Sequence, residues 1–268
     1  MSNSQPIGIF DSGVGGLTVV AAVRAALPRE SIVYLGDTAR VPYGTRSADV
    51  VQRYASNCAR FLQEQGAKLL VVACNTATAH ALTHLQATLP IPVVGVIEPG
   101  ARLAARTSTR GVIGVIGTEG TVASGSYQRA LGALVPAARV VAVACPLLVP
   151  LAEEGLTHHP ATALLAREYL APLLEAGIDT LVLGCTHYPI LRPLLQEVAG
   201  PGVHIIDSAT AVADAVAVAV ATGGLEAGAG VGAARYYATD VTARLHRVGS
   251  AFLGAPMGAV QWVDIRGA

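Results

Sequence analysis

The sequence lacks a net charge, a basic cluster and a long apolar run. Its 268 residues include 18 basic and 18 acidic side chains, and no segment concentrates Lys or Arg as nucleic-acid binding requires. The longest apolar stretches, such as residues 69–73 and 215–221, are much shorter than the roughly 20 residues that cross a bilayer. Because 52% of the residues are hydrophobic, we predict a globular protein that requires no nucleic acid and no membrane.

Cysteine is scarce, and no targeting segment is visible. The N-terminal MSNSQP leads directly into the apolar IGIF, without the basic and apolar regions of an export signal. The four cysteines show no CxxC spacing, so neither a disulfide framework nor a zinc site is expected. These absences predict a cytoplasmic protein with free thiols and no metal.

Short β-rich segments alternate with amphipathic segments along most of the chain. The amphipathic segments include residues 17–26, 48–65 and 159–175, and Gly or Pro residues follow several of them as stop signals. This alternation is typical of α/β proteins with mostly parallel sheets flanked by helices. The expected strands lie at residues 7–10, 32–35, 69–73, 93–97, 112–117, 139–144, 181–184 and 203–207.

The sequence contains an internal repeat. The sequence DSG follows the first strand and TEG follows a later one, while ACNT and GCTH repeat at nearly the same offset. Such internal repetition indicates a duplicated unit. We predict two pseudo-symmetric lobes with the active site in the cleft between them. Residues 1–98 plus 207–268 form the first lobe, to which the C-terminal part adds strands and a helix, and residues 99–206 form the second.

Cys74 and Cys185 each follow a strand directly. Ligands of open parallel sheets bind beyond the carboxyl ends of the strands, so both thiols are expected at the binding rim. Each precedes residues that can start a helix, whose dipole lowers a thiol pKa from about 8.5 toward neutrality. Free cysteine is more often a packing residue, and we keep that interpretation for Cys58 and Cys145, which have no polar partner in sequence.

Two opposed thiols suit proton transfer with inversion. One thiolate removes a proton from a carbon while the thiol on the opposite face delivers another, which predicts racemisation or epimerisation. We expect no cofactor. Lys68, the single lysine, precedes a strand at the end opposite the rim, where it could not hold pyridoxal phosphate. The turn at residues 10–17 lacks the GxGxxG order of a dinucleotide site, although with Ser12 it could hold a carboxylate.

Asp11 and His187 each allow two interpretations. Asp11 follows a strand, where it is either a helix cap or a carboxylate that tunes a group in the cleft. His187 lies two residues after Cys185. It is either a proton relay or a solvated surface histidine.

Six motifs together resemble the glutamate racemases of the cofactor-independent aspartate/glutamate racemase superfamily. They follow the order of that family over residues 7–209, and the combination is much more specific than any one motif. The motifs are FDSGVGGL at 10–17, GDTARVPYG at 36–44, ACNTAT at 73–78, VIGTEGT at 115–121, LAEEG at 151–155 and GCTHYP at 184–189.

The resemblance implies roles for individual residues. Cys74 would exchange the α-proton of D-glutamate and Cys185 that of L-glutamate. Asp11 would assist the first cysteine and His187 the second, with Glu153 as an acidic residue near the cleft. The positions that match substrate-binding residues of the family are Ser12, Tyr43, Gly44, Asn75, Thr76 and Thr186, with Asp11 and His187 also near the substrate and Thr118 and Thr121 as weaker candidates.

The resemblance also implies a biological setting. Members of the family supply D-glutamate for peptidoglycan, and hence for cell-wall biogenesis and cell shape, and are commonly cytoplasmic homodimers. Two alternatives stay open. An aspartate racemase or a related two-cysteine racemase is disfavoured by GDTARVPYG and GCTHYP. A non-enzymatic amino-acid-binding protein is disfavoured by both rim cysteines, because binding a dicarboxylate requires no thiolate.

Overall fold

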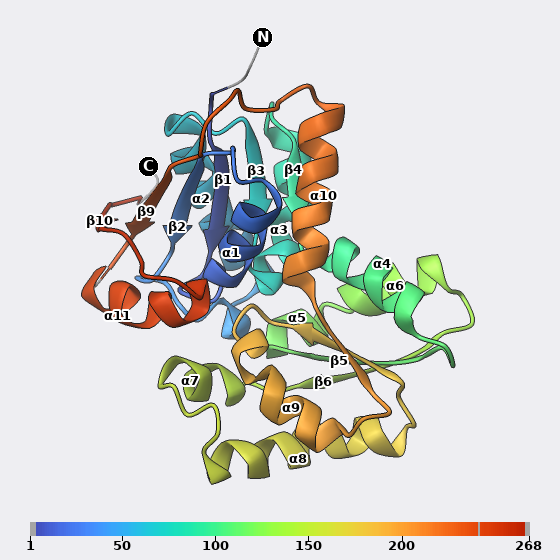
Figure 1. The fold of residues 1–268 in the computed structure, drawn as a ribbon. Helices are drawn as coiled ribbons and strands as arrows, with labels where there is room; N and C mark the ends of the chain where they lie inside the picture. Colours follow the sequence, from blue (N-terminus) through green and yellow to red (C-terminus); the bar gives the residue numbers. More distant parts are fainter. Residues whose placement is uncertain (1–3, 241, 266–268) are drawn as a thin grey trace.

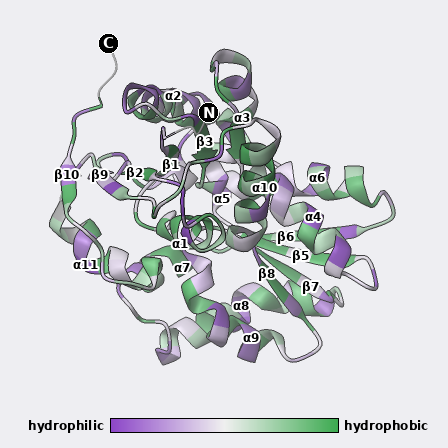
Figure 2. Ribbon diagram, turned by 45° about the horizontal axis from the view of Figure 1, so that its top comes forward, coloured by the Kyte–Doolittle hydropathy of each residue, from purple (hydrophilic) through white to green (hydrophobic). Residues whose placement is uncertain are grey.

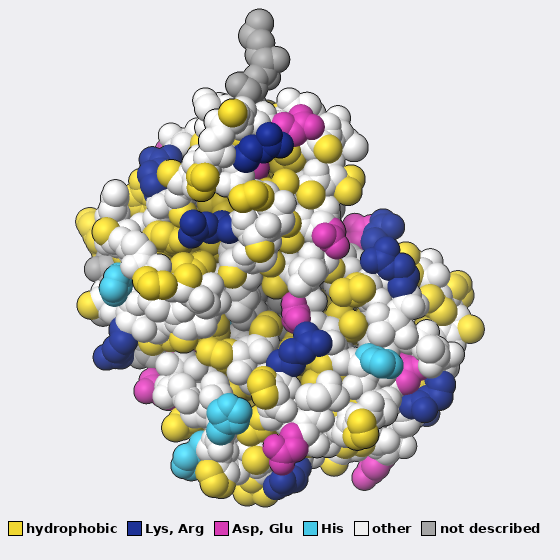
Figure 3. Space-filling model, in the orientation of Figure 1, with side chains coloured by type: hydrophobic (Ala, Val, Ile, Leu, Met, Phe, Trp, Pro, Cys, Tyr) yellow, Lys and Arg dark blue, Asp and Glu magenta, His cyan; other side chains and the backbone are white. Residues whose placement is uncertain are grey.

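A computed structural model describes residues 4–240 and 242–265 and contains two parallel sheets, each flanked by helices (Figure 1). The predicted α/β fold class is confirmed. Figure 2 shows that the strands are largely hydrophobic, as expected for parallel strands covered on both faces. Basic and acidic side chains are interspersed on the face seen in Figure 3, in agreement with the balanced composition. None of the described helices is both long and apolar enough to cross a bilayer.

The first sheet has six parallel strands in the order β10-β9-β2-β1-β3-β4. Side chains alternate between its two faces, so Ile7 and Ile9 pack with α1 and α10, whereas Phe10 packs with α2 and α3. The elements are β1 (Ile7–Asp11), α1 (Leu17–Ala26), β2 (Ile32–Gly36), η1 (Tyr43–Thr45), α2 (Ala48–Glu64), β3 (Leu69–Val72), α3 (Asn75–Thr88), β4 (Val93–Gly95), α10 (Ser208–Thr222), β9 (Ala234–Ala238), α11 (Thr242–Leu253) and β10 (Val260–Trp262).

The second sheet has four parallel strands in the order β6-β5-β7-β8. Figure 1 shows α4 and α6 on one side of it and α8 and α9 on the other. The elements are α4 (Ile97–Thr107), β5 (Val112–Gly117), α5 (Glu119–Ala123), α6 (Ser126–Leu134), β6 (Arg139–Ala144), α7 (Leu148–Glu153), α8 (Pro160–Glu175), β7 (Thr180–Gly184), η2 (Tyr188–Leu191), α9 (Arg192–Ala199) and β8 (His204–Asp207).

The chain crosses between the sheets twice. It leaves the first sheet through α4 and returns through α10, and these two helices pack against each other. The C-terminal strands β9 and β10 extend the first sheet, and α11 packs against α1, as the sequence predicts for one lobe. The proposed boundaries at residues 98 and 206 fall at the start of α4 and within β8. The division into lobes stays a prediction, and its residues 1–3, 241 and 266–268 lie outside the described part of the chain.

Candidate active site

Cys74 lies where β3 ends and α3 begins. Its backbone is extended, with φ −68° and ψ 124°, and its Sγ accepts a hydrogen bond of 3.5 Å from the N–H of Ala77. This bond satisfies one of the N–H groups that the first turn of a helix leaves free. The thiol also donates to Ser12 Oγ at 3.7 Å. The side chain therefore occupies the rim position that the sequence predicts for it.

The Cys74 thiol does not have the lowered pKa expected of a helix N-terminus. Burial, and next the charge of the Asp11 carboxylate, raise the Cys74 pKa to about 12. Hydrogen bonds with Ala77 and Ser12 act in the opposite direction but are outweighed. The expectation of a readily formed thiolate is wrong for Cys74, because excluding water from a thiolate costs more than one helix terminus provides.

Cys185 follows β7 in the second sheet. No α-helix begins there, contrary to the prediction, because the N–H of Tyr188 closes a tight turn on the Cys185 carbonyl at 3.2 Å and leads into the short helix η2. The first residue of α9 is Arg192. The Cys185 Sγ instead lies 3.8 Å from Nδ1 of His187, so its polar neighbour is an imidazole.

His187 joins Cys185 to an acidic side chain. Its Nε2 lies 2.9 Å from Oε1 of Glu153, the last residue of α7. Burial opposes protonation, but hydrogen bonds with Cys185 and Glu153 and nearby negative charges raise the His187 pKa to about 10. With 3% of its surface exposed, His187 is not a solvated surface residue, so that interpretation is wrong. A cationic imidazole at this position stabilises negative charge on the neighbouring sulfur.

Asp11 is fully buried at the end of β1. Its Oδ2 accepts a hydrogen bond from the N–H of Gly13 at 3.0 Å, and its Oδ1 accepts one from Thr186 Oγ1 at 3.3 Å. The helix-cap interpretation is wrong, because the residue that precedes α1 is Gly16. The alternative, a carboxylate that tunes nearby groups, agrees with the contribution of Asp11 to the raised pKa of Cys74.

The turn between β1 and α1 meets the loop after β7 because residue 15 is glycine. A Cβ at Gly15 would lie 2.4 Å from Thr186 Oγ1 and 2.6 Å from His187 Nδ1. Thr18, at the start of α1, donates to the Thr186 carbonyl at 3.4 Å. The turn therefore brings its backbone against the second sheet's rim, where no side chain would fit.

Three threonine hydroxyls from the two halves of the chain form a cluster. Thr76 Oγ1 lies 2.8 Å from Thr118 Oγ1 and 3.1 Å from Thr121 Oγ1. Gly44 lies beside this cluster, since a Cβ there would come within 2.7 Å of the Thr118 Cβ. Tyr43 turns its phenol away, into a hydrogen bond with a buried carboxylate. The backbone of residues 43–44 is therefore the part that faces the hydroxyl groups.

Sequence analysis did not identify two contacts at this site. The phenol of Tyr127 in α6 donates to Asn75 Oδ1 at 2.8 Å. The ring of Phe252 in α11 meets His187 edge-on, with ring centroids 5.4 Å apart. Neither residue belongs to a recognised motif. Both are brought to the rim by helices that come from distant parts of the chain, so local patterns carry no signal for them.

The remaining thiols and the lysine lie outside this cluster. Cys58 and Cys145 are fully buried within apolar clusters, and the Cys58 sulfur also lies 3.8 Å from the Tyr43 phenol. Lys68 precedes β3, at the end opposite Cys74, and its Nζ pairs with Glu30 Oε2 at 2.5 Å. In the described ranges, no group of three or more His, Cys, Asp and Glu side chains could hold a metal ion.

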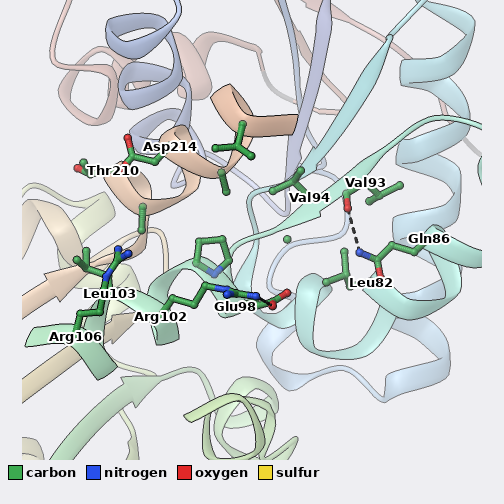
Figure 4. A pocket seen from close by; sticks show the side chains of 15 residues that line it. Leu82, Gln86, Val93, Val94, Glu98, Arg102, Leu103, Arg106, Thr210 and Asp214 are labelled. Atoms are coloured by element: carbon green, nitrogen blue, oxygen red, sulfur yellow. Dashed lines mark hydrogen bonds and ion pairs between the residues drawn. The ribbon is translucent and has the colours of Figure 1, made fainter. Parts of the chain in front are cut away.

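A cavity of about 550 Å³ lies elsewhere, where α4 and α10 meet α3 and β4. Its wall combines apolar side chains such as Leu103 with the polar side chains of Glu98, Arg102 and Asp214 (Figure 4). No predicted site residue lines it. The size of this cavity therefore does not identify the reaction site, whereas the polar groups around the two rim cysteines have the required chemistry.

Comparison with known proteins defines the class. Residues 17–216 match the family model described as Asp/Glu/Hydantoin racemase, so the chain is an amino-acid racemase and an isomerase. More closely, the chain belongs to the glutamate racemase family, because a glutamate racemase from Geobacter metallireducens is 54% identical to it over 97% of both chains. The resemblance drawn from the six motifs is confirmed.

Solved structures agree with this assignment. A glutamate racemase isoform from Bacillus anthracis matches with a TM-score of 0.94 and 40% identity, over 98% of both chains. A glutamate racemase from Francisella tularensis, crystallised with D-glutamate, matches with a TM-score of 0.92 and 35% identity, again over 98% of both chains. The fold of the chain is therefore closely similar to the folds of these two glutamate racemases.

Proposed function

We propose that the protein interconverts L-glutamate and D-glutamate by moving the α-proton between the thiols of Cys74 and Cys185, without a cofactor. The observation that carries this proposal is the pairing of each rim thiol with its own polar group. Cys74 lies beside Ser12 and is influenced by Asp11, whereas Cys185 lies beside His187. The two pairs are connected, because Thr186, which lies between Cys185 and His187 in sequence, donates a hydrogen bond to Asp11.

The groups beside the two thiols suit reaction from L-glutamate. A cationic His187 stabilises a thiolate at Cys185, while the raised pKa of about 12 keeps Cys74 a thiol. The Cys185 thiolate takes the α-proton, so the C–H bond breaks as an S–H bond forms. The Cys74 thiol then gives its proton to the opposite face of the carbanion, which produces D-glutamate and leaves a thiolate at Cys74.

Reaction from D-glutamate requires a thiolate at Cys74. The Asp11 carboxylate contributes to the high pKa of that thiol. A substrate ammonium group beside Asp11 would offset its negative charge and thereby favour the thiolate. Substrate binding and activation of Cys74 are in this way coupled through Asp11.

Glutamate is expected to be held by groups on both sides of the cleft. The donors are the hydroxyls of Thr76, Thr118, Thr121 and Ser12, the Asn75 amide and the backbone at residues 43–44, together with Thr186 and His187. Preorganised donors stabilise charge that develops on the α-carboxylate, and water exclusion strengthens them. These residues are our proposal for the substrate contacts.

Family membership supports a proposal for the cellular role. We propose a cytoplasmic homodimer that supplies D-glutamate for peptidoglycan synthesis. Light scattering on the purified protein tests the dimer, and a monomer at micromolar concentration would contradict it. Rescue of D-glutamate auxotrophy in a bacterium tests the pathway role.

The direct test of the activity uses L-glutamate in deuterated buffer without pyridoxal phosphate. We expect the circular dichroism of glutamate to decay to zero while mass analysis shows deuterium at the α-carbon. An unchanged signal would contradict the proposal. If aspartate racemised instead, the cofactor-independent mechanism would be supported but the assignment of glutamate as the substrate would be wrong.

A further inference from the structure

Tyr127 and Asn75 form a buried hydrogen bond between the two halves of the molecule. Tyr127 lies in α6, which packs on the second sheet, and Asn75 is the first residue of α3, directly after Cys74. The phenol donates to Asn75 Oδ1 at 2.8 Å, and the two residues are 2% and 3% exposed. The bond therefore connects a helix of the second sheet to the residue beside a proposed catalytic thiol.

This bond determines which way the Asn75 amide faces. The buried phenol O–H needs an acceptor, and Asn75 Oδ1 is the one that the described residues give it, whereas the NH₂ group of the amide can only donate. With Oδ1 occupied by Tyr127, the Nδ2 group points the other way, and it is buried without a hydrogen-bond partner among residues 4–240 and 242–265. A buried donor without a partner is unfavourable. The free NH₂ group is thus a donor available to a ligand oxygen.

The packing around Tyr127 holds its phenol in place. Gly184, immediately before Cys185, leaves room for the ring, because a Cβ there would lie 3.0 Å from Tyr127 Cε2. Gly100 of α4 is also close, since its Cβ would lie 3.6 Å from the phenol oxygen. Burial, and next the charge of Cys185, raise the Tyr127 pKa. The phenol consequently stays protonated and remains a donor.

We propose that Tyr127 is a positioning residue that orients the Asn75 amide so that its Nδ2 donates to a carboxylate of glutamate. This inference rests on the proposed function, in which Asn75 binds the substrate. Because the two residues belong to different halves of the chain, separating the halves would break the bond and release the amide. The Nδ2 group of Asn75 therefore faces the substrate when the two sheets have the arrangement seen here.

The test compares Tyr127→Phe with Tyr237→Phe. Tyr237 is the control, because its phenol also donates to a side-chain amide, Gln65 Oε1 at 3.3 Å, in a partly buried contact of the first sheet. Loss of one hydrogen bond that supports binding corresponds to about a tenfold change. We expect Tyr127→Phe to lower kcat/KM for both enantiomers about tenfold. KM should rise because the amide contacts the bound substrate, and kcat should fall because the amide also stabilises charge that develops in the reaction. Tyr237→Phe should change neither.

A double-variant cycle separates positioning from general packing. In an Asn75→Ala background, Tyr127→Phe should have no further effect on KM, because the amide that it orients is gone. An additive effect, or an unchanged KM in Tyr127→Phe, would overturn the inference. Asn75→Asp, which keeps the acceptor for Tyr127 but replaces the donor with an oxygen, should also raise KM. If the wild-type protein did not racemise glutamate, the proposed function would fail before Tyr127 was tested.

Discussion

His187 Nε2 lies 2.9 Å from Glu153 Oε1, and this partly buried contact supports a positive charge beside the Cys185 sulfur. Burial alone would favour the neutral imidazole. The carboxylate and the sulfur reverse that preference and bring the His187 pKa to about 10. The arrangement therefore provides a charged partner for a thiolate where water is excluded.

His187 should keep its proton well above the pH at which an ordinary histidine loses it. The folded pKa of about 10 lies above the ordinary value of 6.5, so the stabilising contribution of the charged ring is fully present below pH 6.5 and is lost as pH rises through about 10. Nitrogen-15 NMR of the imidazole ring should therefore show His187 as a cation between pH 6.5 and 9, where an ordinary histidine becomes neutral.

The comparison variant for this experiment is His187→Gln, which has no proton to lose in that range. Its spectrum should lack the two ring signals, which assigns them to His187. Shifts of a neutral ring at pH 8 in the wild-type protein would mean that His187 is not held in its charged form.

Gly15→Ala should push apart the turn after β1 and the loop after β7. The added methyl group would lie 2.4 Å from Thr186 Oγ1 and 2.6 Å from His187 Nδ1, so the loop that carries Cys185 must move. Overpacking of this kind costs about 1–3 kcal/mol of stability. Misplacement of reacting groups by about 1 Å lowers rates by about 100-fold, and we expect a loss of that order in kcat/KM for a protein that still folds.

The matched control is Gly132→Ala in α6. A Cβ at Gly132 meets no atom within 4 Å, so this substitution should raise stability by roughly 0.5–1 kcal/mol through the helix preference of alanine. Its racemase activity should equal that of the wild type. Full activity in Gly15→Ala would show that close contact between the turn after β1 and the loop after β7 is not needed for catalysis.

Much of the architecture was predictable because strands and motifs are local signals. The apolar segments at residues 112–117 and 139–144 became strands with the expected bounds. The repeated ACNT and GCTH segments correctly indicated that Cys74 and Cys185 each follow a strand. In parallel sheets such positions lie at the binding edge, so the location of both thiols followed from the strand pattern.

The electrostatics of the site was not predictable, because it depends on contacts between distant segments. The helix position of Cys74 suggested a lowered pKa, but burial and Asp11 raise it. Glu153 was expected near the cleft, yet its pairing with His187 required the folded arrangement of α7 and the loop after β7. Tyr127 gave no signal at all, since its partner Asn75 is far away in sequence.

The most direct test of the two-thiol mechanism uses Cys74→Ala and Cys185→Ala, with Cys58→Ala as the buried control. Each rim variant is incubated in deuterated buffer with L-glutamate and, separately, with D-glutamate. Loss of one acid–base group lowers rates by about 10²–10⁴-fold, so racemisation should nearly cease in both variants and remain normal in Cys58→Ala. We predict that Cys74→Ala still introduces α-deuterium into L-glutamate alone, and Cys185→Ala into D-glutamate alone. Undiminished racemisation in either variant, or deuterium entering the same enantiomer in both, would contradict a mechanism with one thiol on each face of the substrate.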